Sequence, residues 1–184
     1  MGLIIEDGKG TGRTAHVDNE NRLNVLAITS SLEQHVNHID GLAFSALVSV
    51  TPTGAGDCFG YIKNESDTDM IVTAIMVRCA SDEIIQIKLG DSGTPTGGTD
   101  FTLVNRNAGS GNVASVDSQQ GVDITGLSGG AVVAGTFVKG GESSVYIPIE
   151  SALIIPTGKV ITFYAVTGTA AIMIGAAIHF HSHK

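Results

Sequence analysis

Three histidines near the end of the sequence form the pattern best suited to chemistry. His179, His181 and His183 alternate with Phe180 and Ser182. Alternate residues of a β-strand share one face, so three imidazoles at this spacing could bind one zinc or nickel ion. Nothing nearby in the sequence supplies a second shell to orient the rings, so we favour solvated histidines at a strand end. A further alternative is a metal shared by the tails of symmetric copies.

The candidate nucleophiles lack the partners that catalysis needs. Cys58 and Cys79 do not form a C-x-x-C motif, and the sequence contains no G-x-S-x-G motif. Both cysteines lie in expected strands, where a small thiol is usually a buried packing group. We therefore expect no disulfide framework, no catalytic residues, no cofactor and no enzymatic activity.

Two other patterns resemble ligand sites only in composition. Gly8-x-Gly10-x-Gly12 has the glycines of a phosphate loop, but it lacks the preceding strand and the following helix that such a loop requires. Four acidic residues flank the expected third strand: Asp67, Asp69, Asp82 and Glu83. No D-x-D-x-D-G calcium loop is present, so we interpret these residues as solvated turn carboxylates.

Composition and charge exclude several classes of partner. Only 15% of the 184 residues are charged, against roughly 25% in a typical soluble domain. The net charge is −8, and the 10 lysines and arginines are scattered, which argues against direct nucleic-acid binding. The longest apolar run, 170–178, is far shorter than the ~20 residues of a membrane span. We also expect no secretory signal, because acidic residues follow 2–5 at once.

Residues 1–42 differ from the remainder of the chain. Glycines interrupt the segment and no helical period persists, apart from one possible helical turn within 30–39. An isolated segment of this length cannot bury its own backbone. We therefore predict an extended N-terminal arm over residues 1–42 that lies on a partner surface.

Strand patterns follow one another at short intervals from residue 43 onward, with no helical crossover between them. Each is rich in β-branched residues and ends at a Gly, Pro or Asn turn. The expected strands are 45–51, 58–63, 70–79, 84–89, 101–104, 131–138, 144–149, 152–155, 160–167 and 170–180. Some of these ranges show a weak pattern, so we expect about eight strands in all. That number predicts an all-β fold over 43–184, an antiparallel β-sandwich of jelly-roll type.

Three strands and one loop carry more detailed predictions. Alternation places Ile172, Ile174, Ile178 and Phe180 on the core face of the last strand. Residues 70–79 are apolar on both faces, so a neighbouring subunit could cover one of them. The alternation assigns to one face Met70, Val72, Ala74 and Met76, and to the other Ile71, Thr73, Ile75 and Val77. Pro148 predicts an edge strand or a bulge. Residues 105–130 show little pattern and are expected to form a long loop with one weak strand near 113–116.

The first part of the chain resembles virion structural proteins of tailed bacteriophages. The resemblance rests on the pattern Asp7-Gly8-x-Gly10-x-Gly12-Arg13-x-Ala15-x-Val17-Asp18-x-x-Asn21-Arg22-Leu23-x-Val25. It continues through Gly41-x-Ala43-Phe44 and through 60–64, and it covers roughly residues 1–80. The later residues agree only in their β-rich character.

Among such proteins, the size, acidity and expected fold are most similar to those of a capsid decoration, or cement, protein. The resemblance implies a homotrimer on the outer capsid surface, assembled in the host cytoplasm, whose arm contacts the major capsid protein. The residues expected to make these contacts are Arg13, Val17, Arg22, Leu23, Val25, Leu26 and Ile28. Apolar side chains and added strands of the arm would then supply the binding area.

Two rival interpretations remain open. The chain could instead belong to a tail, baseplate or head fibre and contact a receptor or glycan through the loops of 90–130. It could also be a small metal-binding enzyme of the cupin type that uses His179, His181 and His183. Deletion of the arm tests the first alternative, and metal analysis of histidine variants tests the second.

Overall fold

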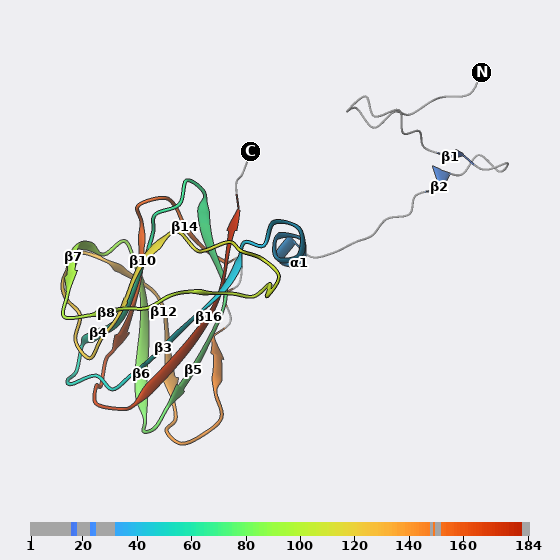
Figure 1. Ribbon diagram of the computed structural model, residues 1–184. Helices are drawn as coiled ribbons and strands as arrows, with labels where there is room; N and C mark the ends of the chain where they lie inside the picture. Colours follow the sequence, from blue (N-terminus) through green and yellow to red (C-terminus); the bar gives the residue numbers. More distant parts are fainter. Residues whose placement is uncertain (1–15, 18–22, 25–31, 148, 150–151, 182–184) are drawn as a thin grey trace. The chain divides into compact units, whose positions relative to one another are not determined.

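The computed structural model describes residues 16–17, 23–24, 32–147, 149 and 152–181 (Figure 1). The chain divides into two compact units, 1–31 and 32–184. In the first unit, β1 (His16–Val17) pairs antiparallel with β2 (Leu23–Asn24). Val17 lies directly opposite Leu23 in this pair, so two of the expected arm contact residues are neighbours.

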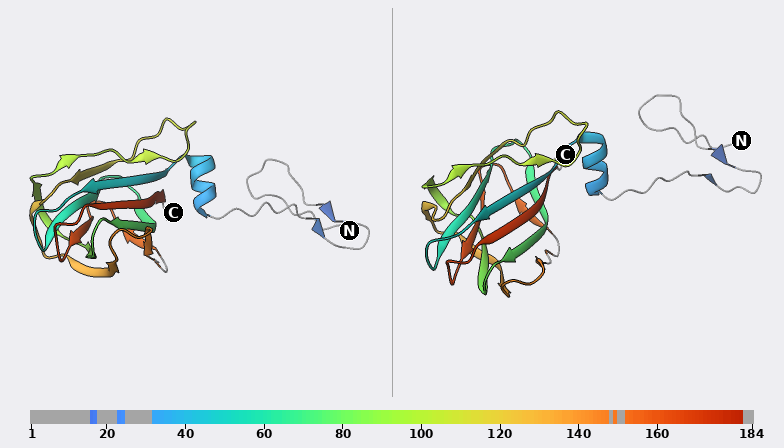
Figure 2. Two further views of the ribbon diagram at one scale, coloured as in Figure 1. Left: turned by 90° about the horizontal axis from the view of Figure 1, so that it is seen from below. Right: turned by 60° about the horizontal axis from the view of Figure 1, so that its bottom comes forward.

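The second unit consists mainly of two antiparallel sheets, which confirms the predicted all-β, antiparallel class (Figures 1 and 2). Sheet I has the order β12 (Ala131–Val138), β6 (Glu83–Leu89), β15 (Val160–Ala165), β4 (Asp57–Asn64), β10 (Val116–Gln120) and β8 (Thr99–Asp100). Sheet II has the order β13 (Val145–Ile147), β5 (Asp69–Cys79), β16 (Ile172–His181), β3 (Ala43–Val50) and β9 (Val104–Asn105). A further strand, β14 (Leu153–Ile155), also pairs with β5. The strand that precedes Pro148 thus ends at Ile147 and lies at a sheet edge.

The core lies between the two sheets and takes alternate residues from each strand. Ile85 and Ile87 of β6 and Phe163 of β15 come from sheet I, and all are buried. From sheet II, β16 contributes the four predicted residues, all buried: Ile172, Ile174, Ile178 and Phe180. Cutting one such isoleucine to alanine typically costs about 2–5 kcal/mol, so this core accounts for much of the stability of the fold.

One face assignment was wrong because β5 contains a bulge. Opposite β16, Ala177 pairs with Ala74 but Ile178 pairs with Val72, so Thr73 is an extra residue. An extra residue exchanges the two faces of a strand beyond it. Ile75 therefore faces the core with Val72, whereas Met76 points outward.

The segment 105–130 is more ordered than the predicted loop. It contains β10, and it contains β11 (Thr125–Ser128), which pairs with β7 (Ser92–Thr96). Ile124 and Leu127 pack on outward-facing side chains of sheet I and form a second apolar cluster. Hydrophobic alternation does not reveal these strands, because their residues are mostly Gly, Ser, Thr and Gln.

The second unit begins with a short helical segment, α1 (Leu32–His35) followed by the π-helical turn η1 (Val36–Asp40) (Figure 2). Val36 is fully buried. The side-chain amide of Asn107 donates to the Asn37 carbonyl at 3.0 Å, and that of Asn112 donates to the Asp40 carbonyl at 2.7 Å. Residues 32–42, which we assigned to the extended arm, therefore belong to the second unit. Neither helical segment within the described residues has the length and apolarity of a bilayer span.

Candidate interaction surfaces

A row of apolar side chains crosses the outer face of sheet II. Leu47 on β3 lies opposite Gly175 on β16, Gly175 lies opposite Met76 on β5, and Met76 lies opposite Tyr146 on β13. The three larger side chains are unusually exposed for their type: Leu47 by 58%, Met76 by 51% and Tyr146 by 55%. We call Leu47, Gly175, Met76 and Tyr146 the apolar row.

The rows on either side of the apolar row are almost uncharged. On one side lie Ser49, Met173 and Arg78, and Met173 is 47% exposed. On the other side lie Ser45, Ala177 and Ala74. These rows carry a single charged residue, Arg78, and no carboxylate. A face of this kind is typical of a protein–protein contact rather than of free surface.

The β12 edge of sheet I is a second uncharged surface. Its residues 131–138 include no charged side chain, and the strand pairs with β6 on one side only. Phe137, Val132 and Val133 are all exposed. A long apolar edge is open to an added strand, although a bulge between Val132 and Ala134 reduces its regularity.

Part of the outer face of sheet I is covered by the chain itself. Asp91, which follows β6, is buried and accepts three hydrogen bonds. They come from the Thr162 hydroxyl at 2.6 Å, the Tyr164 hydroxyl at 3.1 Å and the Gly130 amide at 2.8 Å. The segment that covers the sheet begins near Asp91 and ends near Gly130, so this one carboxylate connects both of its ends to β15.

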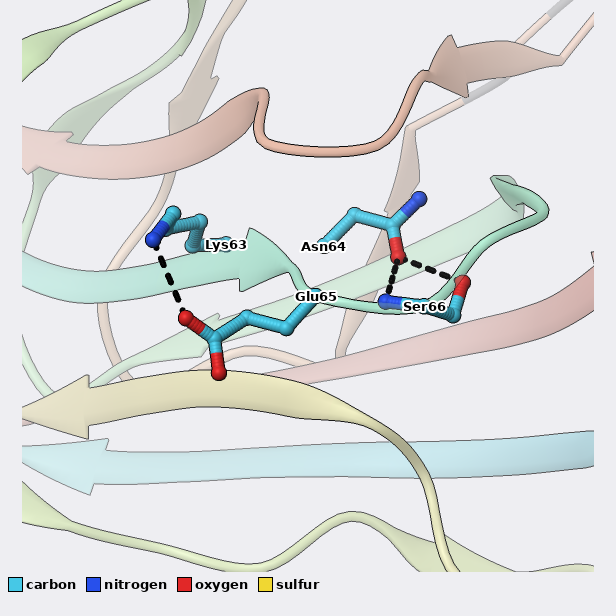
Figure 3. Close-up of polar contacts among 4 residues, drawn as sticks. All are labelled: Lys63, Asn64, Glu65 and Ser66. Atoms are coloured by element: carbon cyan, nitrogen blue, oxygen red, sulfur yellow. Dashed lines mark hydrogen bonds and ion pairs between the residues drawn. The ribbon is translucent and has the colours of Figure 1, made fainter.

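The β4–β5 turn fixes side chains next to this covered face (Figure 3). The buried Asn64 side chain accepts from the Ser66 amide at 3.0 Å and from its hydroxyl at 2.7 Å, and it donates to the Ile155 carbonyl at 2.9 Å. Beside it, the Lys63 ammonium pairs with Glu65 at 3.0 Å. Such an Asx turn holds the chain where β4 leads into β5.

The predicted histidine cluster is only partly described. His179 lies on β16 and is buried, His181 is the last residue of β16, and His183 lies outside the described residues. Among the residues that the structure describes, no three His, Cys, Asp or Glu side chains lie close enough together to hold a metal ion. The metal-binding alternative thus gains no geometric support from the described part of the chain.

Of the expected capsid-contact residues, the structure describes two. Val17 and Leu23 belong to the β1–β2 pair. Arg13, Arg22, Val25, Leu26 and Ile28 lie outside the described residues. Sequence reasoning did not select Leu47, Tyr146 or Met173, although each is a large apolar residue next to at least one buried residue of its strand.

The two thiols and the turn carboxylates have structural surroundings. Burial raises the pKa of Cys58 to about 12 and that of Cys79 to about 11, so both thiols stay protonated at neutral pH and are poor nucleophiles. Asp82 accepts from the Gly140 amide at 2.9 Å, and Glu83 accepts from the Thr167 amide at 2.8 Å. These two carboxylates tie loops to the start of β6.

Comparison with known proteins adds no relationship. No protein-family model, no curated protein and no solved structure matches this chain.

Proposed function

We propose that this chain is a structural protein of a tailed bacteriophage particle, a decoration protein that binds the outer capsid surface and stabilises the shell. In this proposal the second unit associates with copies of itself, as a trimer, and residues 1–31 contact the major capsid protein. The observation that carries the proposal is the apolar row, which lies exposed on a sheet that already has a complete core on its other face.

The charge distribution favours a second copy as the partner of the apolar row. Each copy carries a net charge of −8, so copies repel one another through most of their surface. The apolar row and its neighbouring rows contain no carboxylate, and contact there keeps the acidic side chains apart while it removes apolar area from water. A symmetric oligomer then presents several N-terminal units at once, which multiplies weak capsid contacts.

We also propose that the sandwich is a jelly roll, and the nested order of strand pairs supports this. The first and last principal strands pair, β3 with β16, and inside them β4 pairs with β15. Next, β5 pairs with β13 and β14, and β6 pairs with β12. A long two-stranded ribbon folded across itself produces this order, and β16·β5 and β15·β6 are the pairs that join its halves.

Capsid binding tests the functional proposal directly. The full chain and a chain of residues 32–184 are mixed with capsids assembled from the accompanying major capsid protein, and bound chain is measured by co-sedimentation. Starting at residue 32 keeps Val36 in the core, so the shortened chain should unfold in urea at the same midpoint as the second unit of the full chain.

We expect the full chain to bind and the 32–184 chain to remain folded but bind at least tenfold more weakly. Equal binding by the two chains would refute the role of residues 1–31. Failure of the full chain to bind capsids, together with binding to tails or fibres, would favour the rival position in the particle.

A further inference from the structure

A polar cleft of about 400 Å³ opens on the covered side of sheet I, away from the apolar row. Three neighbouring strands form its floor: Tyr61 and Lys63 of β4, Asp117 of β10 and Val160 of β15. The segment 90–95, which includes the start of β7, and the turn 158–159 form its walls. The volume falls within the range of roughly 300–1,000 Å³ that is typical of small-molecule sites.

Tyr61 is the clearest sign that the cleft takes a ligand. Its side chain is only 2% exposed and lines the cleft. Its hydroxyl makes no hydrogen bond to any residue that the structure describes, and its oxygen is not one of the sealed unpaired atoms of those residues, so it reaches the solvent of the cleft. A hydroxyl group of a ligand in the cleft can take the place of that water. Burial, followed by the nearby Asp117 carboxylate, raises the pKa of Tyr61, which keeps the hydroxyl protonated and able to donate.

The charges around the cleft select the class of ligand. Lys63 and Lys159 line the cleft together with Asp91 and Asp117, and Lys63 is already paired with Glu65, so an anion and a metal cation would each meet a like charge there. Asp91 already accepts three hydrogen bonds, which leaves Asp117 as the available acceptor. A cleft lined by both donors and acceptors suits a ligand whose every group both donates and accepts, namely a neutral polyhydroxyl compound.

The walls of the cleft are held in place before any ligand arrives. Asp91 is fixed by its three donors, and Lys63 is held by Glu65. Gly93 has a φ of 114°, and an added Cβ there would collide with the Gly126 carbonyl oxygen of β11. β7 and β11 therefore approach as closely as glycine allows, and a preformed wall lowers the entropy cost of binding.

From this geometry we propose that the cleft bounded by Tyr61, Lys63, Asp117 and Lys159 binds a neutral saccharide. The Tyr61 hydroxyl and Lys159 donate to sugar hydroxyl groups, and Asp117 accepts from them. The inference does not rest on the proposed capsid function, because it uses a different face of the second unit.

The test is an NMR titration of the ¹⁵N-labelled full chain with glucose, galactose, mannose and N-acetylglucosamine, and with the acidic sugar N-acetylneuraminic acid. We expect at least one neutral sugar to shift the amide signals of 90–94, 117 and 158–160 saturably, and the acidic sugar to bind at least tenfold more weakly. Tyr61→Phe removes a single hydroxyl, so the Kd should rise about three- to tenfold. Tyr146→Phe, on sheet II, is the matched control and should leave the Kd unchanged.

A glycan array with the same full chain then distinguishes a free monosaccharide from a sugar within a surface glycan. Three results would overturn the proposal: no neutral sugar shifts these signals at saturating concentration, the acidic sugar binds as tightly as the neutral ones, or folded Tyr61→Phe binds as tightly as wild type. Amide spectra of each variant establish that it is folded, so a loss of binding is not confused with unfolding.

Discussion

The outer faces of the two sheets differ in how far the chain itself covers them. On sheet I, the β7–β11 pair covers outward-facing residues such as Cys58 and Val160, and Asp91 anchors the covering segment. On sheet II, the apolar row lies exposed across four strands in register. The same chain therefore covers part of one outer face with its own residues and leaves the apolar row of the other exposed.

The difference separates stability from assembly. Residues on the covered face contribute to the free energy of folding, because folding removes their apolar atoms from water and gives their polar groups protein partners in place of water. Residues of the apolar row add little to folding, because they stay in water in the isolated chain. Substitutions on the covered face should thus lower the free energy of unfolding, whereas substitutions in the apolar row should weaken assembly. The following predictions test that contrast.

The largest effect is expected from removing the anchor of the covered face. Asp91→Ala leaves the Thr162 hydroxyl, the Tyr164 hydroxyl and the Gly130 amide without their acceptor. Leaving one buried and two half-buried donors without this acceptor should lower the free energy of unfolding by about 3–5 kcal/mol, measured by urea denaturation. Asp57→Ala, at an exposed turn on Thr53 and Gly54, is the comparison and should cost less. Equal losses in the two variants would contradict the anchoring role of Asp91.

A second effect on the covered face depends on pH. Burial raises the pKa of Cys58 from 9.0 to about 12, which means that folding favours the neutral thiol. The resulting stability is complete below pH 9 and is lost as the pH rises from 9 to 12, up to about 4 kcal/mol. Burial also raises the pKa of Tyr164, so the stability that its neutral hydroxyl contributes is likewise lost as the pH rises.

We therefore expect urea midpoints to fall between pH 8 and pH 11, and to fall less steeply in Cys58→Ala, which lacks the thiol but keeps Tyr164. An equally steep fall in both proteins would show that ionisation of Cys58 does not contribute.

The smallest effect on stability is expected on the exposed face. Met76→Lys replaces a half-exposed side chain of the apolar row. At a protein concentration low enough that both proteins are monomers, it should change the free energy of unfolding by no more than about 0.5 kcal/mol. At that concentration it should nevertheless reduce binding of an apolar fluorescent dye to the native chain. Val113→Lys, where the valine is 75% exposed and lies outside the row, is the matched control. A loss of stability well above 1 kcal/mol in Met76→Lys would place Met76 in the core instead.

The sequence predicted the fold class well, because buried strands repeat a simple pattern. Ile172, Ile174, Ile178 and Phe180 alternate without interruption, and β16 follows that alternation. The pattern failed at β5, where the bulge at Thr73 exchanged the faces, since an extra residue has no signature in a strand that is apolar on both sides. It also failed at β11, whose polar residues pair through their backbone.

The candidate surfaces were harder to predict than the core. Each member of the apolar row is one ordinary residue in its own strand, and only the registers of β3, β16, β5 and β13 bring the members together. Registers depend on bulges and turns that are distant in sequence. For the same reason the sequence does not predict the cleft around Tyr61, because its walls come from segments about thirty to a hundred residues from Tyr61 in the sequence.

Sedimentation-equilibrium measurement of mass tests the central claim most directly. At micromolar concentration we predict that the full chain forms a closed oligomer, that Met76→Lys sediments as a monomer of 18.9 kDa, and that Val113→Lys behaves as wild type. This outcome is required if a second copy of the chain binds over the apolar row. A wild-type chain that stays monomeric at every concentration, or a Met76→Lys variant that still assembles, would contradict it.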